Sequence, residues 1–342
     1  MNLSGRKALT CIITFFIIPL FLIGCINNSN NDKENNGIKK ISVGKGAVLK
    51  SEEGVYNTYD YKQGKYTKVE SEKTILVYDE SSSTYIATNN NKTYVVKTNE
   101  EYEIQDEEYD GLKMSPKGKY ISYFVYDDGF KPKIIDLEEN KELDIKLNTI
   151  ISGTIYDWYD EENIIYYGVN RDKVNGVFKY NLITKKEELL YKVEKGYLAY
   201  IKGTINNVVF LAINIDNDKE LILINKDTKK ISSISYDIEI IDDIAFIDGN
   251  IYFTGKVKDN AESLYEIEDN KIKRLIFDFP FITDINKGLR VDKDNNILVI
   301  GKGSSDSQYE SVYSYAKDGS VSVVSEEAID YVFIDYRENE DY

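Results

Sequence analysis

The chain has 342 residues, with 59 acidic and 43 basic side chains and no histidine. The net charge of −16 argues against a surface for duplex nucleic acid, because such a surface needs a basic stripe to displace counterions. Without histidine there is no Ser-His-Asp or Cys-His site, no HExxH zinc site and no histidine proton shuttle near neutral pH. A hydrophobic fraction of 42% still allows a real core.

The first 24 residues have the pattern of a secretory leader. Two basic residues and no acid precede an almost wholly apolar run at 11–23, which is short for a membrane span. The run ends in Leu22-Ile-Gly-Cys25, which resembles the lipobox of bacterial lipoproteins. The resemblance implies cleavage after Gly24 and a diacylglyceryl group on the Cys25 thiol, and two acyl chains anchor stably where one is marginal. An uncleaved signal anchor is the alternative.

Both cysteines are accounted for by this leader. Cys11 lies in the apolar run and would leave with it, so the mature chain keeps only the lipidated Cys25 and forms no disulfide. We therefore predict a leader at 1–24, a lipidated cysteine with an Asn-rich flexible tether at 25–42, and a folded domain at 43–342. Loss of the leader would make the net charge −18. The predicted location is the extracytoplasmic face of the bacterial cell membrane, with membrane lipid bound through Cys25.

From residue 43 onward the sequence repeats a strand pattern. Short segments rich in Tyr, Ile and Val alternate with turns of Asn, Asp, Gly and Lys, and helical stripes of useful length are hard to find. The segments group in fours, with about 43 residues in each group, which is the size of a β-propeller blade. A single sheet of this kind has two faces to bury, and stacking blades around an axis buries both.

The predicted fold is all-β, a single β-propeller of about seven four-stranded blades, with six or eight as alternatives. Blades are expected to start near residues 73, 108, 149, 194, 237 and 280. The segment 43–72 supplies only three strands, and 328–336 is a lone strand near the C-terminus. We predict that this lone strand becomes the innermost strand of the first blade and closes the ring.

Some stretches resemble known propeller repeats. Residues 113–123, Lys-Met-Ser-Pro-Lys-Gly-Lys-Tyr-Ile-Ser-Tyr, are similar to the S-P-D-G-K-x-I-x-[FY] signature of TolB-like propellers, with Lys117 in place of Asp. Residues 158–167 share this register without the Pro and Gly, and 291–299 resemble an NHL-type turn. The resemblance to TolB-like or WD-like propellers covers about one and a half repeats. It implies the fold and little about activity, because such propellers serve as binding platforms, as gates of peptidases, or as enzymes.

Carboxylates are the abundant reactive groups on the predicted innermost strands. Asp157 and the pair Asp242-Asp243 fall on such strands, and Asp284 lies near the start of another. Acids around the axis can line a hydrolase or lyase tunnel, or they can bind water or an ion. Trp158 aligns with Met114, where a large residue packs between blades, although a role in stacking on a ligand is the alternative. The candidate binding residues are Tyr156, Asp157, Trp158, Asp243 and Asp284.

Other chemical motifs fail on inspection. Asp292, Asp294 and Asn296 have the D-x-D-x-N spacing of a calcium loop, but Ile297 replaces the next Gly and Gly303 replaces the bidentate Glu. That segment and the similar cluster at 214–218 are interpreted as solvated hairpin turns, with a loose calcium site as the alternative, and the Ser-rich 304–307 as a polar loop. No glycine-rich nucleotide motif occurs. We predict no catalytic residue, no metal site and no cofactor.

A repeat fold with broad faces and no catalytic constellation favours a non-enzymatic binding or scaffolding module for an envelope protein, peptide or glycan. A minority of the 29 tyrosines, such as Tyr85, Tyr126 and Tyr309, are expected on the loops, where Tyr favours protein binding. One alternative is a carboxylate-dependent polysaccharide hydrolase or lyase that uses Asp157 and Asp243. The other is a ligand sensor for a membrane partner. Nucleic acid is not expected as a partner.

Overall fold

The computed structural model describes residues 41–98, 100–126 and 129–337. The predicted leader, Cys25 and nearly all of the tether therefore lie outside the described residues. The described ranges belong to one unit, residues 40–342. They contain strands and two 3₁₀ turns, η1 (Pro116–Gly118) and η2 (Ile285–Lys287). None of the helical segments in these ranges is long and apolar enough to cross a membrane.

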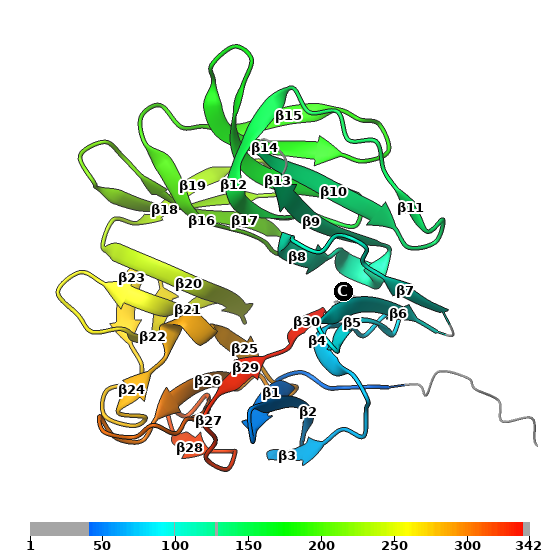
Figure 1. Cartoon of the computed structure of the whole chain (residues 1–342). Helices are drawn as coiled ribbons and strands as arrows, with labels where there is room; N and C mark the ends of the chain where they lie inside the picture. Colours follow the sequence, from blue (N-terminus) through cyan, green and yellow to red (C-terminus); the bar gives the residue numbers. More distant parts are fainter. Residues whose placement is uncertain (1–40, 99, 127–128, 338–342) are drawn as a thin grey trace, which may run out of the picture. The chain divides into compact units, whose positions relative to one another are not determined.

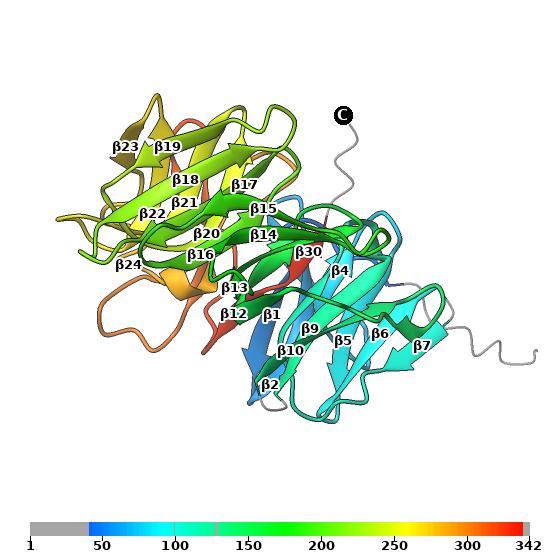
Figure 2. The ribbon, with the colours of Figure 1, turned by 90° about the horizontal axis from the view of Figure 1, so that it is seen from above.

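The strands form seven sheets, which follow one another around the centre of Figure 1 and are seen from another side in Figure 2. We number these blades 1 to 7 in chain order. Blade 1 contains β29 (Tyr331–Phe333), β1 (Val48–Glu52), β2 (Val55–Lys62) and β3 (Lys65–Lys68); blade 2 contains β4 (Thr74–Asp79), β5 (Thr84–Asn89), β6 (Lys92–Lys97) and β7 (Glu100–Glu103); blade 3 contains β8 (Asp110–Met114), β9 (Tyr120–Tyr126), β10 (Phe130–Asp136) and β11 (Lys141–Glu142).

The remaining blades follow the same order from the centre outward. Blade 4 contains β12 (Thr149–Trp158), β13 (Asn163–Asn170), β14 (Asn175–Asn181) and β15 (Glu187–Lys192); blade 5 contains β16 (Tyr197–Gly203), β17 (Asn207–Ile213), β18 (Lys219–Asn225) and β19 (Ile231–Ser235); blade 6 contains β20 (Ile238–Ile247), β21 (Asn250–Val257), β22 (Ser263–Glu268) and β23 (Lys271–Arg274); blade 7 contains β24 (Ile282–Thr283), β25 (Leu289–Val291), β26 (Ile297–Lys302), β27 (Ser311–Tyr315) and β28 (Val321–Val323).

The predicted seven-bladed propeller is confirmed. The first strands of blades 2 to 7 begin within three residues of the predicted starts. Each strand directs alternate side chains toward the two neighbouring blades, so both faces of a blade are buried. Ile121 and Tyr123 of β9 pack toward blade 2, whereas Tyr120 and Phe124 pack toward blade 4.

The predicted closure of the ring is also confirmed, with one addition. β29 pairs antiparallel with β1, with Phe333 opposite Val48, and so supplies the innermost strand of blade 1. After Ile334 the chain crosses to the next blade, and β30 (Asp335–Arg337) pairs in parallel with β4. β30, drawn in red, lies near the centre of Figure 1. The C-terminal segment therefore joins two blades, where the sequence predicted one.

The hairpin turns use Asn and Asp side chains as acceptors. The Oδ1 atom of Asp292 accepts hydrogen bonds from the backbone N–H groups of Asp294 (2.8 Å) and Asn296 (2.9 Å). The Oδ1 atom of Asn214 does the same for Asp216 (2.9 Å) and Asp218 (2.8 Å). These side chains replace the missing backbone partners of a tight turn. Both acidic clusters are thus hairpin turns, as interpreted from the sequence, but Asp292 itself is buried and not solvated.

Two of the three tyrosines expected on loops are exposed there, and one is not. Tyr126 is 76% exposed at the end of β9, and Tyr309 is 51% exposed just before β27. Tyr85 is only 5% exposed, so its assignment to a loop was wrong. It falls within β5 opposite Val96 of β6, where the sheet buries its ring.

Candidate functional site

The two ends of the propeller differ in what they carry. Neighbouring strands run antiparallel, so one end of each blade carries the linker from the previous blade and the loop between the second and third strands. We call this end the linker face and the opposite end the hairpin face. Residues at the start of an innermost strand therefore lie toward the linker face, and residues at its end lie toward the hairpin face.

Charged residues of alternating sign line the axis. Successive blades place one such residue on or beside the innermost strand, separated by about one blade of sequence. In chain order they are Lys113, Asp157, Lys202, Asp243, Arg290 and Asp335. Since each residue comes from a different blade, every ion pair among them links two blades.

Asp157 is 3% exposed and its carboxylate is fully engaged. Lys113 Nζ lies 3.1 Å from one carboxylate oxygen and donates to the Tyr156 carbonyl at 2.8 Å. The Gly203 N–H donates to the other oxygen at 2.9 Å. Burial alone would raise the pKa of Asp157, but Lys113, Arg337 and the Gly203 N–H outweigh burial and lower it.

Asp243 is held in the same way by two cations. Lys202 Nζ lies 2.5 Å from its Oδ1 atom, and an Arg290 guanidinium nitrogen lies 2.7 Å from its Oδ2 atom. Arg290 Nε also donates to the Ile334 carbonyl at 3.1 Å, which ties the C-terminal segment to blade 7. Burial would raise the pKa of Asp243, but the two cations lower it.

β30 contributes its own charges to the axis. A guanidinium nitrogen of Arg337 lies 2.9 Å from the Asp335 carboxylate. Burial opposes ionisation of Asp335, yet Arg337, Arg290 and Lys113 lower its pKa to about 2. Asp157 also raises the pKa of Arg337, so the two groups interact across the axis. Asp157, Asp243 and Asp335 are therefore ionised, and each is balanced by cations.

Tyr156 and Trp158 lie in the core between blades 3 and 4. The Tyr156 hydroxyl donates to the Gly111 carbonyl and lies 3.0 Å from Ser122 Oγ. Trp158 is 2% exposed and stacks on Tyr120 with the ring centroids 6.1 Å apart. The geometry of Trp158 is that of the packing alternative, while its Nε1 has no hydrogen-bond partner among the described residues.

Asp284 lies apart from these two aromatic residues, at the linker face. Its carboxylate accepts a hydrogen bond from the Asn286 N–H at 3.1 Å and caps η2. Asp242 interacts electrostatically with Asp284, and the structure gives the Asp242 side chain no hydrogen bond or ion pair with another described residue. Burial, Asp243 and Asp284 together raise the pKa of Asp242 to about 6. The structure thus brings Asp243, Asp242 and Asp284 within electrostatic reach of one another and separates them from Tyr156 and Trp158.

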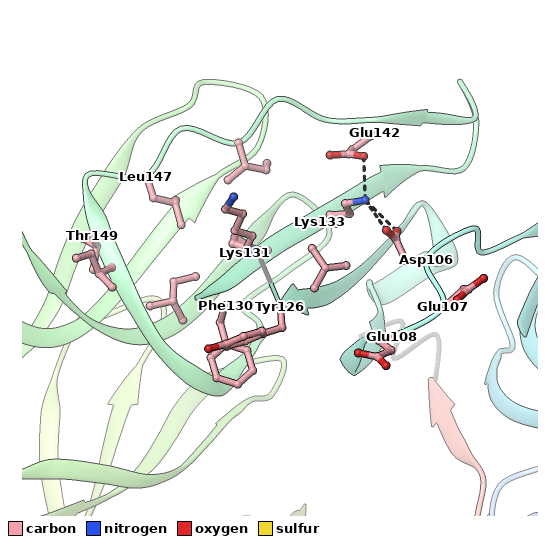
Figure 3. Close-up of a pocket in the computed structure, with 15 residues that line it drawn as sticks. Asp106, Glu107, Glu108, Tyr126, Phe130, Lys131, Lys133, Glu142, Leu147 and Thr149 are labelled. Carbon is pink, nitrogen blue, oxygen red and sulfur yellow. Dashed lines mark hydrogen bonds and ion pairs between the residues drawn. The ribbon is translucent and has the colours of Figure 1, made fainter. Parts of the chain in front are cut away.

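A groove of about 760 Å³ lies over blade 3 at the linker face (Figure 3). One side is formed by the linker from blade 2, the floor by β10, and the other side by the linker into blade 4. Its lining residues are Asp106, Glu107, Glu108, Val125, Tyr126, Phe130, Lys131, Pro132, Lys133, Glu142, Ile145, Leu147, Thr149, Ile150 and Ile151. Apart from Tyr126, sequence reasoning missed this site. A search for strand patterns gives no signal for it, because the groove depends on the early end of β11.

No group of three or more Cys, His, Asp or Glu side chains within the described ranges is arranged to hold a metal ion. The acids at the axis instead face Lys and Arg from neighbouring blades. The arrangement can hold blades together by charge, and at the linker face it offers apolar and acidic surface to a ligand.

Comparisons with known proteins bear on the fold. No protein-family model matches the chain, and no curated protein matches its sequence. The β-propeller domain of the Trilobed protease from Pyrococcus furiosus is similar in structure, with a TM-score of 0.56 and 14% identity over 83% of this chain and 96% of that one. A prolyl endopeptidase is similar with a TM-score of 0.53 and 12% identity over 84% of this chain and 46% of that one.

TolB from Acinetobacter baumannii matches with a TM-score of 0.47 and 8% identity over 77% of this chain and 66% of that one. The chain thus spans nearly the whole protease propeller domain, about two thirds of TolB and about half of the endopeptidase. At these identities the likeness concerns the fold alone. The structure shows seven blades, and its likeness to the protease β-propeller domain agrees with a β-propeller fold.

Proposed function

We propose that this protein is a bacterial lipoprotein, anchored through diacylated Cys25 to the extracytoplasmic face of the cell membrane. Its propeller is a non-enzymatic binding or scaffolding module for an envelope protein, peptide or glycan. The anchoring part rests on the leader and the Leu22-Ile-Gly-Cys25 sequence. The binding part rests on the structure of the propeller's linker face.

One observation carries the binding proposal. Every exposed aromatic side chain among the described residues lies at or beside the linker face, on linkers, on loops or at adjoining strand ends: Tyr56, Tyr126, Phe130, Tyr197, Tyr236, Phe277, Phe279, Phe281 and Tyr309. Exposed large side chains at the hairpin face are aliphatic, such as Ile183 and Ile205. Aromatic residues are enriched at protein interfaces and at sites that stack on ligands, so this asymmetry marks one face for binding.

The axis supports a binding module over a polysaccharide hydrolase or lyase. Such an enzyme needs two carboxyl groups that are available to a substrate, separated by roughly 5–10 Å. Asp157 and Asp243 are each engaged by a Lys and by further donors at 2.5–3.1 Å. Their pKa values are lowered, which suits permanent counter-ions and does not suit a general acid.

Two measurements test the proposal. Cells that make the full chain are labelled with radioactive palmitate, and the same is done with Cys25→Ser. We expect label and membrane association in the wild type and neither in the variant. Full-length protein purified in detergent is then incubated with envelope polysaccharide, and reducing ends are counted. Turnover of the polysaccharide would contradict the non-enzymatic part, and an unlabelled wild type would contradict the anchor.

A further inference from the structure

Blade 3 lacks most of its outer strand, which leaves an edge of β10 exposed. β11 has two residues and pairs only with Ile135 and Asp136 of β10. The corresponding β15 of blade 4 has six residues. In the described part of the chain, residues 130–133 of β10 have a strand partner on the β9 side only. The groove follows this exposed edge, because all four residues line it.

The sequence after β11 explains why the strand ends early. The Leu143 N–H donates to the Ile134 carbonyl at 2.8 Å, and the chain then leaves the sheet. Leu143, Ile145 and Leu147 pack against the cluster between blades 3 and 4. Partial burial of these three apolar side chains favours the path that draws the linker away from the edge of β10.

The exposed edge offers a small set of backbone groups. Alternate residues of an antiparallel strand direct N–H and C=O to opposite edges. Ile134 accepts from Leu143 on the outer side, so Phe130 and Pro132 also face outward. Phe130 offers a donor and an acceptor, whereas Pro132 offers only an acceptor because it has no N–H. This pattern suits one short extended segment.

Apolar side chains stand beside this edge. Tyr126 and Phe130 are in edge-to-face contact, with ring centroids 5.9 Å apart, and both are exposed. Ile150, across the groove near the start of β12, is 80% exposed. Exposed side chains of this size that gather along a groove mark a site for an apolar group of a ligand.

The far side of the groove is acidic. Lys133 lies 2.7 Å from Asp106 and 3.8 Å from Glu142, which balances part of the charge (Figure 3). Glu107 and Glu108 are exposed, and no ion pair joins either of them to a cation within the described ranges. The groove is therefore complementary to a cation placed beside an apolar group.

We propose that the groove binds an extended segment of a partner protein that carries alternating apolar and basic residues. The segment adds to the edge of β10 as a short strand and forms backbone hydrogen bonds with Phe130 and Pro132. An apolar side chain packs on Tyr126, Phe130 and Ile150, and a Lys or Arg faces Glu107 and Glu108. This inference rests on the proposed binding function and names its partner class and site.

The test uses a displayed library of random twelve-residue peptides, selected on the full chain. We expect the enriched peptides to alternate apolar and basic residues. Synthetic copies, measured by fluorescence anisotropy, should bind Phe130→Ala and the double variant Glu107→Lys with Glu108→Lys at least tenfold more weakly. N-methylation of the central peptide amide should weaken binding to a similar extent, because it removes a backbone donor. Circular dichroism checks that the variants remain folded, as expected for exposed side chains.

The matched control is Ile183→Ala, an exposed apolar residue of the hairpin face, which should leave peptide affinity unchanged. Peptides that lose affinity with Ile183→Ala and keep it with Phe130→Ala would overturn the groove while the binding function stands. If no peptide is enriched and the full chain captures an envelope glycan, the peptide groove is likewise overturned while the binding function stands. If neither peptides nor envelope components bind, the inference and the proposed binding function both fail.

Discussion

Lys113 and Asp157 form an ion pair across two blades, and Asp157 is almost wholly buried. The pair itself adds little net stability, because desolvation of the two charges offsets their attraction. Removing one member is costly, because the other charge stays buried without compensation. Lys202 and Asp243 repeat this arrangement between blades 5 and 6. The ion pairs at the axis thus oppose separation of neighbouring blades, because breaking one leaves a buried charge without a partner.

We expect Lys113→Met to lower the free energy of unfolding by about 3 kcal/mol, because it leaves the Asp157 carboxylate without its main counter-ion. Urea denaturation measures this change. Lys317→Met is the matched control, since it breaks the exposed pair with Asp248 and should have little effect. If both variants lose the same free energy of unfolding, breaking the buried pair costs no more than breaking the exposed one, and the prediction is wrong.

The ionisation of Asp242 makes the stability of the fold depend on pH. Its pKa rises from 3.8 to about 6 on folding, so the folded state binds this proton more tightly. The resulting destabilisation is absent below the unfolded pKa, grows as the pH rises through that value and is complete above about 6. Asp242→Asn should therefore stabilise the protein at neutral pH, by on the order of 1 kcal/mol once partial exposure is discounted.

The measurement is the urea midpoint of Asp242→Asn and of wild type at neutral pH and below the unfolded pKa. The variant should be more stable only at neutral pH. Asp306→Asn, in an exposed loop, serves as the control and should show no such dependence. A stabilisation by Asp242→Asn that is the same at both pH values would contradict the electrostatic explanation.

At the scale of elements, the C-terminal segment makes two different connections. β29 completes blade 1, and β30 adds to the inner edge of blade 2 beside β4. The Glu80 N–H donates to the Arg337 carbonyl at 3.0 Å and extends that second connection. β29 therefore closes the ring by completing blade 1, and β30 reinforces blade 2 as an added parallel strand.

Truncation separates these two roles. A chain that ends at Ile334 loses β30 but keeps β29, so blade 1 should stay closed while the amides of β4 exchange faster. A chain that ends at 330 loses both strands, and exchange should then rise in β1 as well. Hydrogen exchange followed by mass spectrometry reads both effects. Unchanged hydrogen exchange in β4 of the chain that ends at Ile334 would show that β30 does not support blade 2.

At the scale of the whole molecule, the architecture was predictable because its signal is local and repeated. Strands alternate with Asn- and Asp-rich turns, and four strands recur in each blade. Closure by β29 followed from counting, since the segment before residue 73 supplies three strands and a blade needs four. β30 was not predictable, because only three residues pair with a strand more than 250 residues away in sequence.

The candidate site was predicted only in part, for a related reason. Asp157 and Asp243 were placed correctly on innermost strands, but their partners Lys113, Lys202 and Arg290 come from other blades. The blade-length spacing of these alternating charges was a readable signal. The groove over blade 3 depends on a strand that fails to continue, which a search for strand patterns does not detect.

The central claim is that the linker face binds an envelope component without turning it over. The direct measurement is capture from native membranes by the full-length protein, compared with two variants. One replaces Tyr126 and Tyr309 of the linker face with Ser, and the other replaces Ile183 and Ile205 of the hairpin face. We predict that wild type and the hairpin-face variant retain the same component, unmodified, and that the linker-face variant loses it. Equal capture by all three proteins, or release of cleaved polysaccharide, would contradict the claim.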